Sequence, residues 1–316
     1  MLRSASLPTP LMSTSSLESV EEADARMWRD KAFARFKSEA EAVLLHFERA
    51  QEWADLIADL LKLQRVLNKY PQFNVVPDKV LVAKRLYQCL NSALPAGVHL
   101  KTLETFELIF SRIGVERLAR DLAFYSEGIF PLYRYAAFQV KPVLLDLFER
   151  HYVPLGPRVV PCLPGLVPAL LLAMDDVGAD RLSQRALSLL DALASCTPIA
   201  AFMAAVWGCL LHNSAVRLQA LHYITTRFPT PGADADDGSG GLGETSKGVA
   251  TTSSARLAVP PELFCPDAEG TVLRSLVVAL QRGDSLVRRT ALELLVNHFP
   301  LPAPEGAAAA AHAAAA

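Results

Sequence analysis

Residue types that could carry catalysis or bind a cofactor are sparse in this sequence of 316 residues. Residues 238–243 read GSGGLG and match the glycine spacing of a dinucleotide-binding loop. Such a loop needs a strand before it and a helix after it, so that backbone amides face the phosphates. The surrounding residues are mostly Gly, Ser, Thr and Asp. We therefore expect a flexible linker here and no cofactor.

Two closely spaced pairs also have the residue types of a reactive site. Cys209 and His212 have the spacing of metal ligands, but no second pair accompanies them and Cys209 lies in an apolar run, which favours a buried thiol. Glu104 and Glu107 share a helix face, but nothing predicts the apolar pocket that acid–base work requires. No nucleophile elbow, P-loop or HExxH motif occurs. We predict no enzyme and no metal; an active site assembled from residues distant in sequence is the alternative.

A basic region is the most suggestive polar feature. Residues 79–120 contain seven Lys and Arg but only three acids, in a chain of net charge −2. If these bases project from one side, they form a surface for an acidic protein partner or for anionic lipid headgroups. Ordinary solvated helix faces are the alternative. The candidate interaction residues are Lys79, Lys84, Arg85, His99, Lys101 and Arg117.

The elements that would position these residues are helices. Hydrophobic residues make up 51% of the chain, aromatic residues only 8%, and apolar residues recur at spacings of three and four. Tyr70-Pro71 should end one helix, and Pro77 should start another with Val80, Ala83 and Tyr87 on one face. Gly114 should close a later helix as a C-cap. We expect about twelve helices, paired as antiparallel neighbours. The near-zero net charge argues against nucleic-acid binding.

A repeated pattern indicates how the helices associate. The segments SAVRLQALHYITTRFP from Ser214 and SLVRRTALELLVNHFP from Ser285 share the pattern V-R-x-x-A-L. Alanine lets two helices approach closely, and the arginine lies where an aspartate such as Asp284 can pair with it and cap the helix. A single hairpin of this kind cannot bury its own apolar face. We therefore predict an all-α, HEAT- or armadillo-like solenoid of antiparallel helix pairs.

Composition along the chain predicts five segments. They are a disordered leader over 1–20, a helical repeat domain over 21–228, a flexible Gly/Ser-rich insertion over 229–262, a final repeat over 263–300 and a low-complexity Ala-rich tail over 301–316. The five scattered cysteines indicate reduced, buried thiols in an intracellular chain. No transmembrane segment is expected, because the longest apolar run, 159–174, contains three prolines.

Several long blocks carry a family resemblance. They are QEWADLIADLLKLQRVL from Gln51, the segment from Val75 that includes KRLYQCLNSALPAGVHLKTLETFELIF, VKPVLLDLFERHYVPLG from Val140 and AFMAAVWGCLLHNSAVRLQAL from Ala201. In this order they resemble the N-terminal domain of the Dopey family. The similarity covers about residues 33–228 and 271–299. The Gly/Ser-rich insertion and the Ala-rich end depart from the family pattern.

The resemblance implies membrane traffic. Dopey proteins are cytosolic scaffolds, held peripherally on Golgi, trans-Golgi and endosomal membranes, that act with a Mon-two type scaffold in endosome-to-Golgi retrieval and Golgi organisation. Kinesin and lipid-flippase machinery are further implied partners, and the family offers no catalytic residues. We therefore predict a non-catalytic scaffold or adaptor module; a helical lipid- or cargo-binding carrier is the alternative. Family members are far longer, so we expect a fragment, a truncated gene model or a short paralogue.

Overall fold

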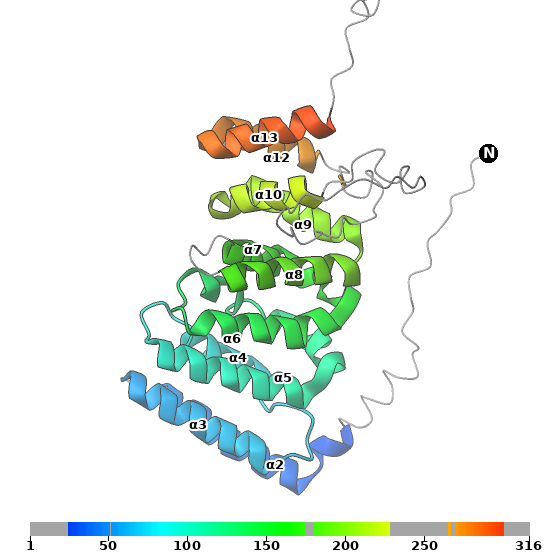
Figure 1. Ribbon diagram of the computed structural model, residues 1–316. Helices are drawn as coiled ribbons and strands as arrows, with labels where there is room; N and C mark the ends of the chain where they lie inside the picture. Colours follow the sequence, from blue (N-terminus) through cyan, green and yellow to red (C-terminus); the bar gives the residue numbers. More distant parts are fainter. Residues whose placement is uncertain (1–24, 51, 175–179, 228–264, 267–269, 300–316) are drawn as a thin grey trace, which may run out of the picture. The chain divides into compact units, whose positions relative to one another are not determined.

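The protein is helical throughout the residues that the computed structural model describes, which are 25–50, 52–174, 180–227, 265–266 and 270–299 (Figure 1). No β-strand occurs in these ranges. The chain divides into two compact units, Met1–Leu147 and Phe148–Ala316. This division falls inside the single domain expected over 21–228. The expected leader, the expected insertion and the Ala-rich tail lie outside the described residues.

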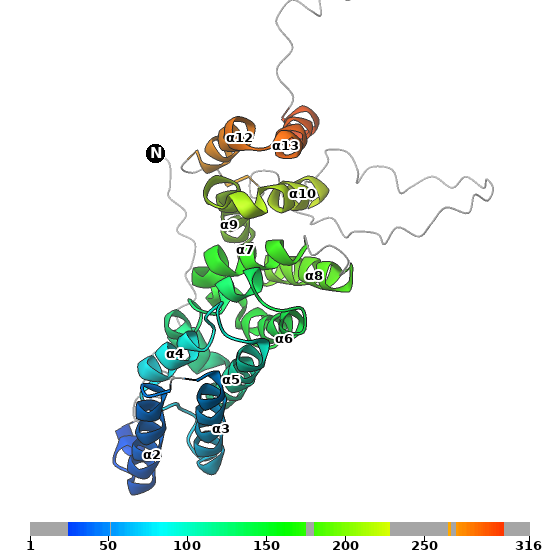
Figure 2. The same ribbon diagram turned by 90° about the vertical axis from the view of Figure 1, so that its left-hand side faces the viewer.

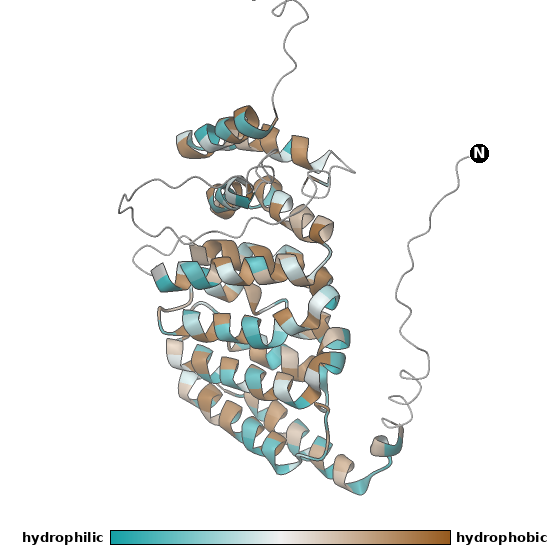
Figure 3. Cartoon of the chain, turned by 45° about the vertical axis from the view of Figure 1, so that its right-hand side comes forward, coloured by the Kyte–Doolittle hydropathy of each residue, from teal (hydrophilic) through white to brown (hydrophobic). Residues whose placement is uncertain are grey.

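The first unit is a set of packed amphipathic helices. Its elements are α2 (Lys31–Phe47), α3 (Trp53–Lys69), α4 (Lys79–Gln88), α5 (Ala96–Tyr125), the 3-10 turn η1 (Phe130–Arg134) and α6 (Val140–Leu147). Helix α2 lies beside α3, while α3, α4 and α6 contact α5 (Figure 2). Apolar and polar residues are interleaved along the helices (Figure 3), so each helix buries one apolar stripe against its neighbours.

Local sequence signals set the helix ends in this unit. Helix α3 ends at Lys69, just before Pro71, as expected from a ring that cannot continue the backbone ladder. Asp78 precedes α4 with a left-handed φ of 48°, which turns the chain sharply after Pro77. Gly114 has φ 70° and interrupts α5, but helical turns resume and reach Tyr125. The expected C-cap is therefore a kink between two helical halves, at a φ that glycine adopts without strain.

The second unit contains three helix pairs within its described residues. Its elements are the π-helical turn η2 (Phe148–Tyr152), the 3-10 segments η3 (Val153–Cys162) and η4 (Ser214–Val216), and the helices α7 (Leu163–Met174), α8 (Asp180–Cys196), α9 (Ile199–His212), α10 (Arg217–Arg227), α12 (Thr271–Arg282) and α13 (Ser285–His298). The pairs are α7 with α8, α9 with α10, and α12 with α13, and α9 also contacts α7 and α12 (Figure 1). The assignment to the HEAT or armadillo type stays a prediction.

The two copies of the V-R-x-x-A-L pattern occupy equivalent places. Ala220 of α10 and Ala291 of α13 are both buried, and the two helices pack on each other. Asp284 caps α13, because its Oδ1 accepts from the backbone N–H of Val287 at 2.8 Å.

The arginines of the repeat do not make the aspartate pairing expected from the sequence. Arg217 Nε donates to the carbonyl of Leu210 at 2.8 Å, and Arg288 Nη2 donates to the carbonyl of Gln281 at 3.3 Å. Each acceptor lies seven residues earlier, in the last turn of the preceding helix. Carbonyls there have no partner within their own helix and carry partial negative charge, so a guanidinium is a favourable donor.

One apolar run is long enough to cross a membrane. Among the described residues, the helical stretch Val140–Met174 meets the length and composition of a span, and half of its apolar window is buried in the protein. The bent pair Ile199–His212 and Ser214–Arg227 meets the same criteria jointly, with an angle of 112° between its parts. Core helices of helical proteins satisfy the same criteria, so the absence of a transmembrane segment stays a prediction.

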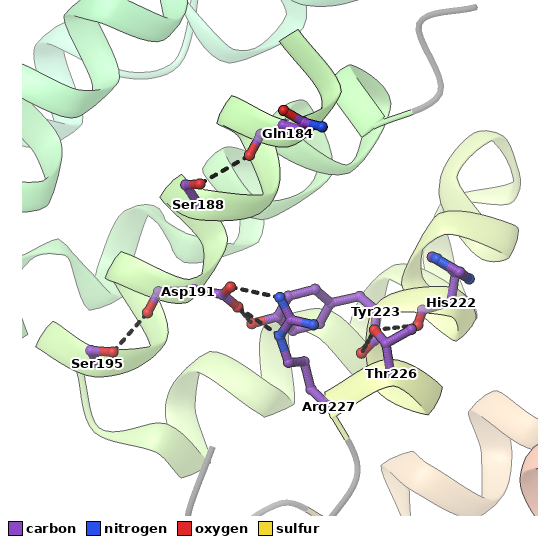
Figure 4. Close-up of polar contacts among 8 residues, drawn as sticks. All are labelled: Gln184, Ser188, Asp191, Ser195, His222, Tyr223, Thr226 and Arg227. Atoms are coloured by element: carbon purple, nitrogen blue, oxygen red, sulfur yellow. Dashed lines mark hydrogen bonds and ion pairs between the residues drawn. The ribbon is translucent and has the colours of Figure 1, made fainter. Parts of the chain in front are cut away.

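A partly buried ion pair joins α8 to α10 (Figure 4). Arg227, only 4% exposed, donates from Nε and Nη2 to the two carboxylate oxygens of Asp191 at 3.0 and 2.7 Å. Tyr223 donates its hydroxyl to the same carboxylate at 3.1 Å. The hydrogen bonds to Asp191 raise the pKa of Arg227, so the guanidinium stays charged in its buried position.

We predict that Asp191→Ala lowers the free energy of unfolding by about 1.5–3 kcal/mol, because it removes the carboxylate that accepts hydrogen bonds from the Arg227 guanidinium and the Tyr223 hydroxyl. Glu293→Ala is the matched control, since its pair with Arg289 is exposed and should contribute less than about 1 kcal/mol. Urea unfolding followed by circular dichroism measures both variants. Equal effects of the two substitutions would contradict the role assigned to Asp191.

We also predict that the thiols of Cys89 and Cys209 resist alkylation in the folded protein. Both are buried, and burial raises the pKa of each to about 12, so neither forms the reactive thiolate at pH 8. Iodoacetamide treatment followed by peptide mass spectrometry should find these two residues modified only after addition of urea. Modification at equal rates with and without urea would show that they are not in the core.

Candidate functional site

The first unit contains an open groove of about 950 Å³. Its walls come from the turn before α2, from α2, from the 75–78 connection, from α4 and from the second half of α5. The residues that line it are Met27, Trp28, Phe33, Glu41, Leu45, Val75, Val76, Asp78, Lys79, Val80, Leu81, Lys84, Ile113, Arg117, Arg120, Asp121 and Tyr125. We call it the α2–α4–α5 groove.

Three apolar side chains of the groove are unusually exposed. Trp28 is 58%, Leu45 58% and Val80 57% accessible to solvent. Trp28 keeps its place through an edge-to-face contact with Phe33, whose ring centroid is 4.9 Å away. Large apolar side chains gathered in one hollow are typical of interaction surfaces.

The groove continues into a smaller hollow of about 480 Å³, with which it shares Val80 and Lys84. Val80 and Lys84 lie four residues apart and therefore on one face of α4. Phe124 of α5, which is exposed, lies on the other side of this hollow. The apolar surface thus extends along the outer faces of α4 and α5.

Most charges around the groove are already paired. Lys79 Nζ lies 2.6 Å from Asp121 and 5.2 Å from the centre of the Phe124 ring. Lys37 contacts both Glu41, at 3.5 Å, and Asp78, at 3.7 Å.

Two bases of the groove are different, because Lys84 and Arg120 are exposed and make no ion pair or hydrogen bond with any described residue. They leave positive charge at the groove edge that the described residues do not neutralise.

A buried hydroxyl also lines the groove. Tyr125 has no solvent-exposed surface, and its hydroxyl finds no hydrogen-bond partner within the described part of the chain. Burial, with a smaller contribution from the nearby Asp121 carboxylate, raises the pKa of Tyr125, so the group remains a hydrogen-bond donor at neutral pH. Leaving a buried hydroxyl without an acceptor lowers the stability of the fold around it.

The structure divides the six interaction residues predicted from the sequence into two groups. Lys79, Lys84 and Arg117 line the groove. Lys101 does not: it lies in the first half of α5 and is paired with Glu104.

Two of the six are buried and cannot contact a partner surface. Arg85 is 6% exposed, pairs with Glu48 and donates to Gln88 at 3.1 Å. His99 is 3% exposed, with Nε2 2.9 Å from the carbonyl oxygen of Asn91.

The cause of the error at Arg85 is the orientation of α4. Its buried residues include Val82, Ala83 and Leu86, whereas the sequence placed Val80, Ala83 and Tyr87 on the inner face. The inner face is therefore rotated toward Arg85, and Val80 faces solvent.

Another base of the predicted region has a structural role. Arg112 donates to the carbonyls of Tyr70 and Phe73 at 2.7 and 2.9 Å, and also to that of Leu67, at the end of α3. No local pattern indicates this contact, because its partners lie about forty residues away in the chain. Trp28, Leu45 and Tyr125 were also missed as groove residues, since separate apolar positions do not reveal a shared hollow.

The described residues contain no group of three or more His, Cys, Asp or Glu that could hold a metal ion. Glu104 and Glu107 lie outside the hollows described here, as Lys101 does. Cys209 and His212 line a separate hollow in the second unit, but Cys209 is buried and its thiol donates to the carbonyl of Ala205. The groove thus offers exposed apolar side chains and basic groups for binding.

Comparison with known proteins agrees with the family resemblance. The family model described as "Dopey, N-terminal" matches residues 30–312. The chain belongs to the Dopey family. Its curated relatives include Protein DOP1B of Xenopus laevis, 34% identical over 272 residues, and Protein DOP1B of Mus musculus, 35% identical over 271 residues. Protein DOP1 of Saccharomyces cerevisiae is 31% identical over 300 residues.

This Dopey domain corresponds to a small part of each relative. The matches cover 86% of the chain but 11% of the Xenopus and mouse proteins, and 87% of the chain but 18% of the yeast protein. No solved structure matches the chain. The groove is built from residues 27–125, and all its lining residues except Met27 and Trp28 fall within the match to the family model.

We predict that bases inside and outside the groove differ in their effect on stability. Arg112→Ala should lower the free energy of unfolding by about 1.5–3 kcal/mol, because three carbonyls lose a charged donor. The exposed pair Lys84→Glu/Arg120→Glu should change it by less than about 1 kcal/mol. Urea unfolding of both proteins measures the difference. Unfolding of the double variant at much lower urea would show that these bases support the fold.

Proposed function

We propose that the chain is a non-catalytic adaptor module in intracellular vesicle traffic, acting in endosome-to-Golgi retrieval and Golgi organisation. Family membership supports a Dopey-type role, and the resemblance described above implies the process. The proposed location is cytosolic, peripherally on Golgi, trans-Golgi and endosomal membranes. No catalytic step is proposed for it.

The observation that carries this proposal is the α2–α4–α5 groove. Binding at protein surfaces depends on a few apolar or aromatic anchors surrounded by polar groups. Trp28, Leu45 and Val80 supply such anchors, and Lys84 and Arg120 supply charge at the edge. An adaptor needs a preformed binding surface of this kind.

The proposed partners are proteins of the trafficking machinery. By resemblance they include a Mon-two type scaffold, with kinesin or flippase machinery as further candidates. Anionic lipid headgroups are a second kind of contact for the exposed bases. The net charge of −2 gives no support to nucleic-acid binding.

A lipid or cargo carrier is a second candidate, favoured by an apolar hollow in the second unit. This hollow, of about 690 Å³, lies between η3, α7 and α9, and its lining includes Leu163, Pro168 and Ala204. Its volume is in the range of small-molecule sites. Native mass spectrometry of delipidated protein mixed with a lipid extract tests this function. Absence of any bound lipid would contradict it.

We predict that the full chain, tagged and expressed in cultured animal cells, co-fractionates in part with Golgi and endosomal membranes. Because the association is peripheral, alkaline carbonate should release it. Density-gradient fractionation with organelle markers measures the distribution, and a cytosolic protein carrying the same tag is the control. Complete recovery in the cytosolic fraction, or resistance to carbonate, would contradict the proposed function.

A further inference from the structure

We propose that the α2–α4–α5 groove receives an amphipathic α-helix of a protein partner, which buries apolar anchors in the groove and places acidic residues beside Lys84 and Arg120. This inference rests on the proposed adaptor function and names the class of partner that the groove takes. It is carried by two independent features of the groove: exposed apolar anchors, and positive charge that no described residue neutralises.

The first feature is the apolar lining. Trp28, Leu45 and Val80 come from three different segments and line one hollow. The adjoining smaller hollow extends this surface to Phe124. An amphipathic helix presents apolar side chains at i, i+3, i+4 and i+7, a row that fits an elongated apolar groove.

The second feature is the distribution of charge. Lys79 forms an ion pair with Asp121, so its charge is already neutralised and contributes little attraction for a partner. Lys84 on α4 and Arg120 on α5 lack any partner among the described residues and line the same groove. Glutamate or aspartate beside the apolar row of the incoming helix would complement both bases and fix its direction.

A protein helix fits these features better than a membrane surface. The lining includes the carboxylates of Glu41, Asp78 and Asp121, which an anionic bilayer would approach together with the bases. The anchors also lie in a hollow, whereas insertion into a bilayer requires side chains that project outward. A helix can place its acids beside Lys84 and Arg120 and keep them away from the carboxylates.

The direct test uses two designed peptides and the full chain. The acidic probe is a helix of about 18 residues, a length that is stable enough in water, with leucines along one face and glutamates beside them. The second probe has every glutamate replaced by lysine. Fluorescence anisotropy should show that the acidic probe binds at least about tenfold more tightly than the basic one.

Charge reversal in the groove should invert this preference. Lys84→Glu/Arg120→Glu should weaken binding of the acidic probe by at least about tenfold and strengthen binding of the basic probe. Arg35→Glu/Arg65→Glu is the matched control, because it makes the same charge change at exposed bases outside the groove. It should leave the preference for the acidic probe unchanged.

A crosslinking measurement separates loss of the site from loss of the fold. An acidic probe with a photo-reactive residue in its leucine row should crosslink to groove residues, above all to Trp28, Leu45 or Val80. Leu45→Glu should abolish this crosslink without changing the circular dichroism spectrum, because Leu45 is largely exposed.

Several outcomes would overturn the inference. They are equal binding of both probes, equal effects of the groove and control variants, and crosslinks outside the groove. Binding of vesicles of phosphatidylcholine with about 20% phosphatidylserine, lost in the groove variant while neither probe binds, would assign the groove to a lipid surface. Self-association in sedimentation, lost in the same variant, would assign it to a second copy of the chain.

The inference and the proposed function fail in different ways. A chain that binds the acidic probe in the groove but stays entirely cytosolic in cells would retain the inference and contradict the proposed traffic role. A chain that co-fractionates with Golgi membranes but binds neither probe would retain the proposed function and contradict the helix-binding groove.

Discussion

An amphipathic helix must cover its apolar stripe, and this constraint underlies both units of the protein. Burial of one large apolar side chain contributes roughly 1.5–3 kcal/mol, so an uncovered stripe forfeits a large part of the stability that a small helix can gain. In the first unit α2 covers α3, and α5 covers α3, α4 and α6. In the second, α9 is covered by α7, α10 and α12. Surface features arise where this covering is incomplete, and the α2–α4–α5 groove is such a place.

Helix ends impose a second constraint, which accounts for many of the basic residues. The last carbonyls of a helix have no hydrogen-bond partner within that helix. In this chain, arginines from other segments donate hydrogen bonds to such carbonyls. Arg112 donates to carbonyls at the end of α3, Arg217 to one at the end of α9 and Arg288 to one at the end of α12. The guanidinium suits this role because it presents several donors in a fixed planar arrangement. A basic region in the sequence is therefore partly structural.

The features that the sequence predicted well are those decided by neighbouring residues. Pro71 follows the end of α3 because its ring geometry is a local property, and Asp284 caps α13 through an N–H only three residues away. The helix end expected at Gly114 is instead a kink within α5. The rotation of α4 was not predictable in this way. Its ten residues offer two overlapping apolar stripes, and only the contacts with α2 and α5 decide which one is buried. That choice places Arg85 inside and Val80 outside.

The groove could not be predicted from local sequence patterns, because the segments that form it are distant in the sequence. Trp28 precedes α2, Val80 starts α4 and Tyr125 ends α5, and nothing in their individual surroundings links them. Charge counting pointed to the region that contains the bases of the groove but could not sort its members, since pairing depends on which carboxylates lie nearby. Lys79 meets Asp121 and Arg85 meets Glu48, so neither adds net attraction for a partner. Lys84 and Arg120 remain unneutralised at the groove edge. Because the whole chain has a net charge of −2, this positive charge is local to the groove. A local charge of this kind is what selective docking of an acidic helix requires.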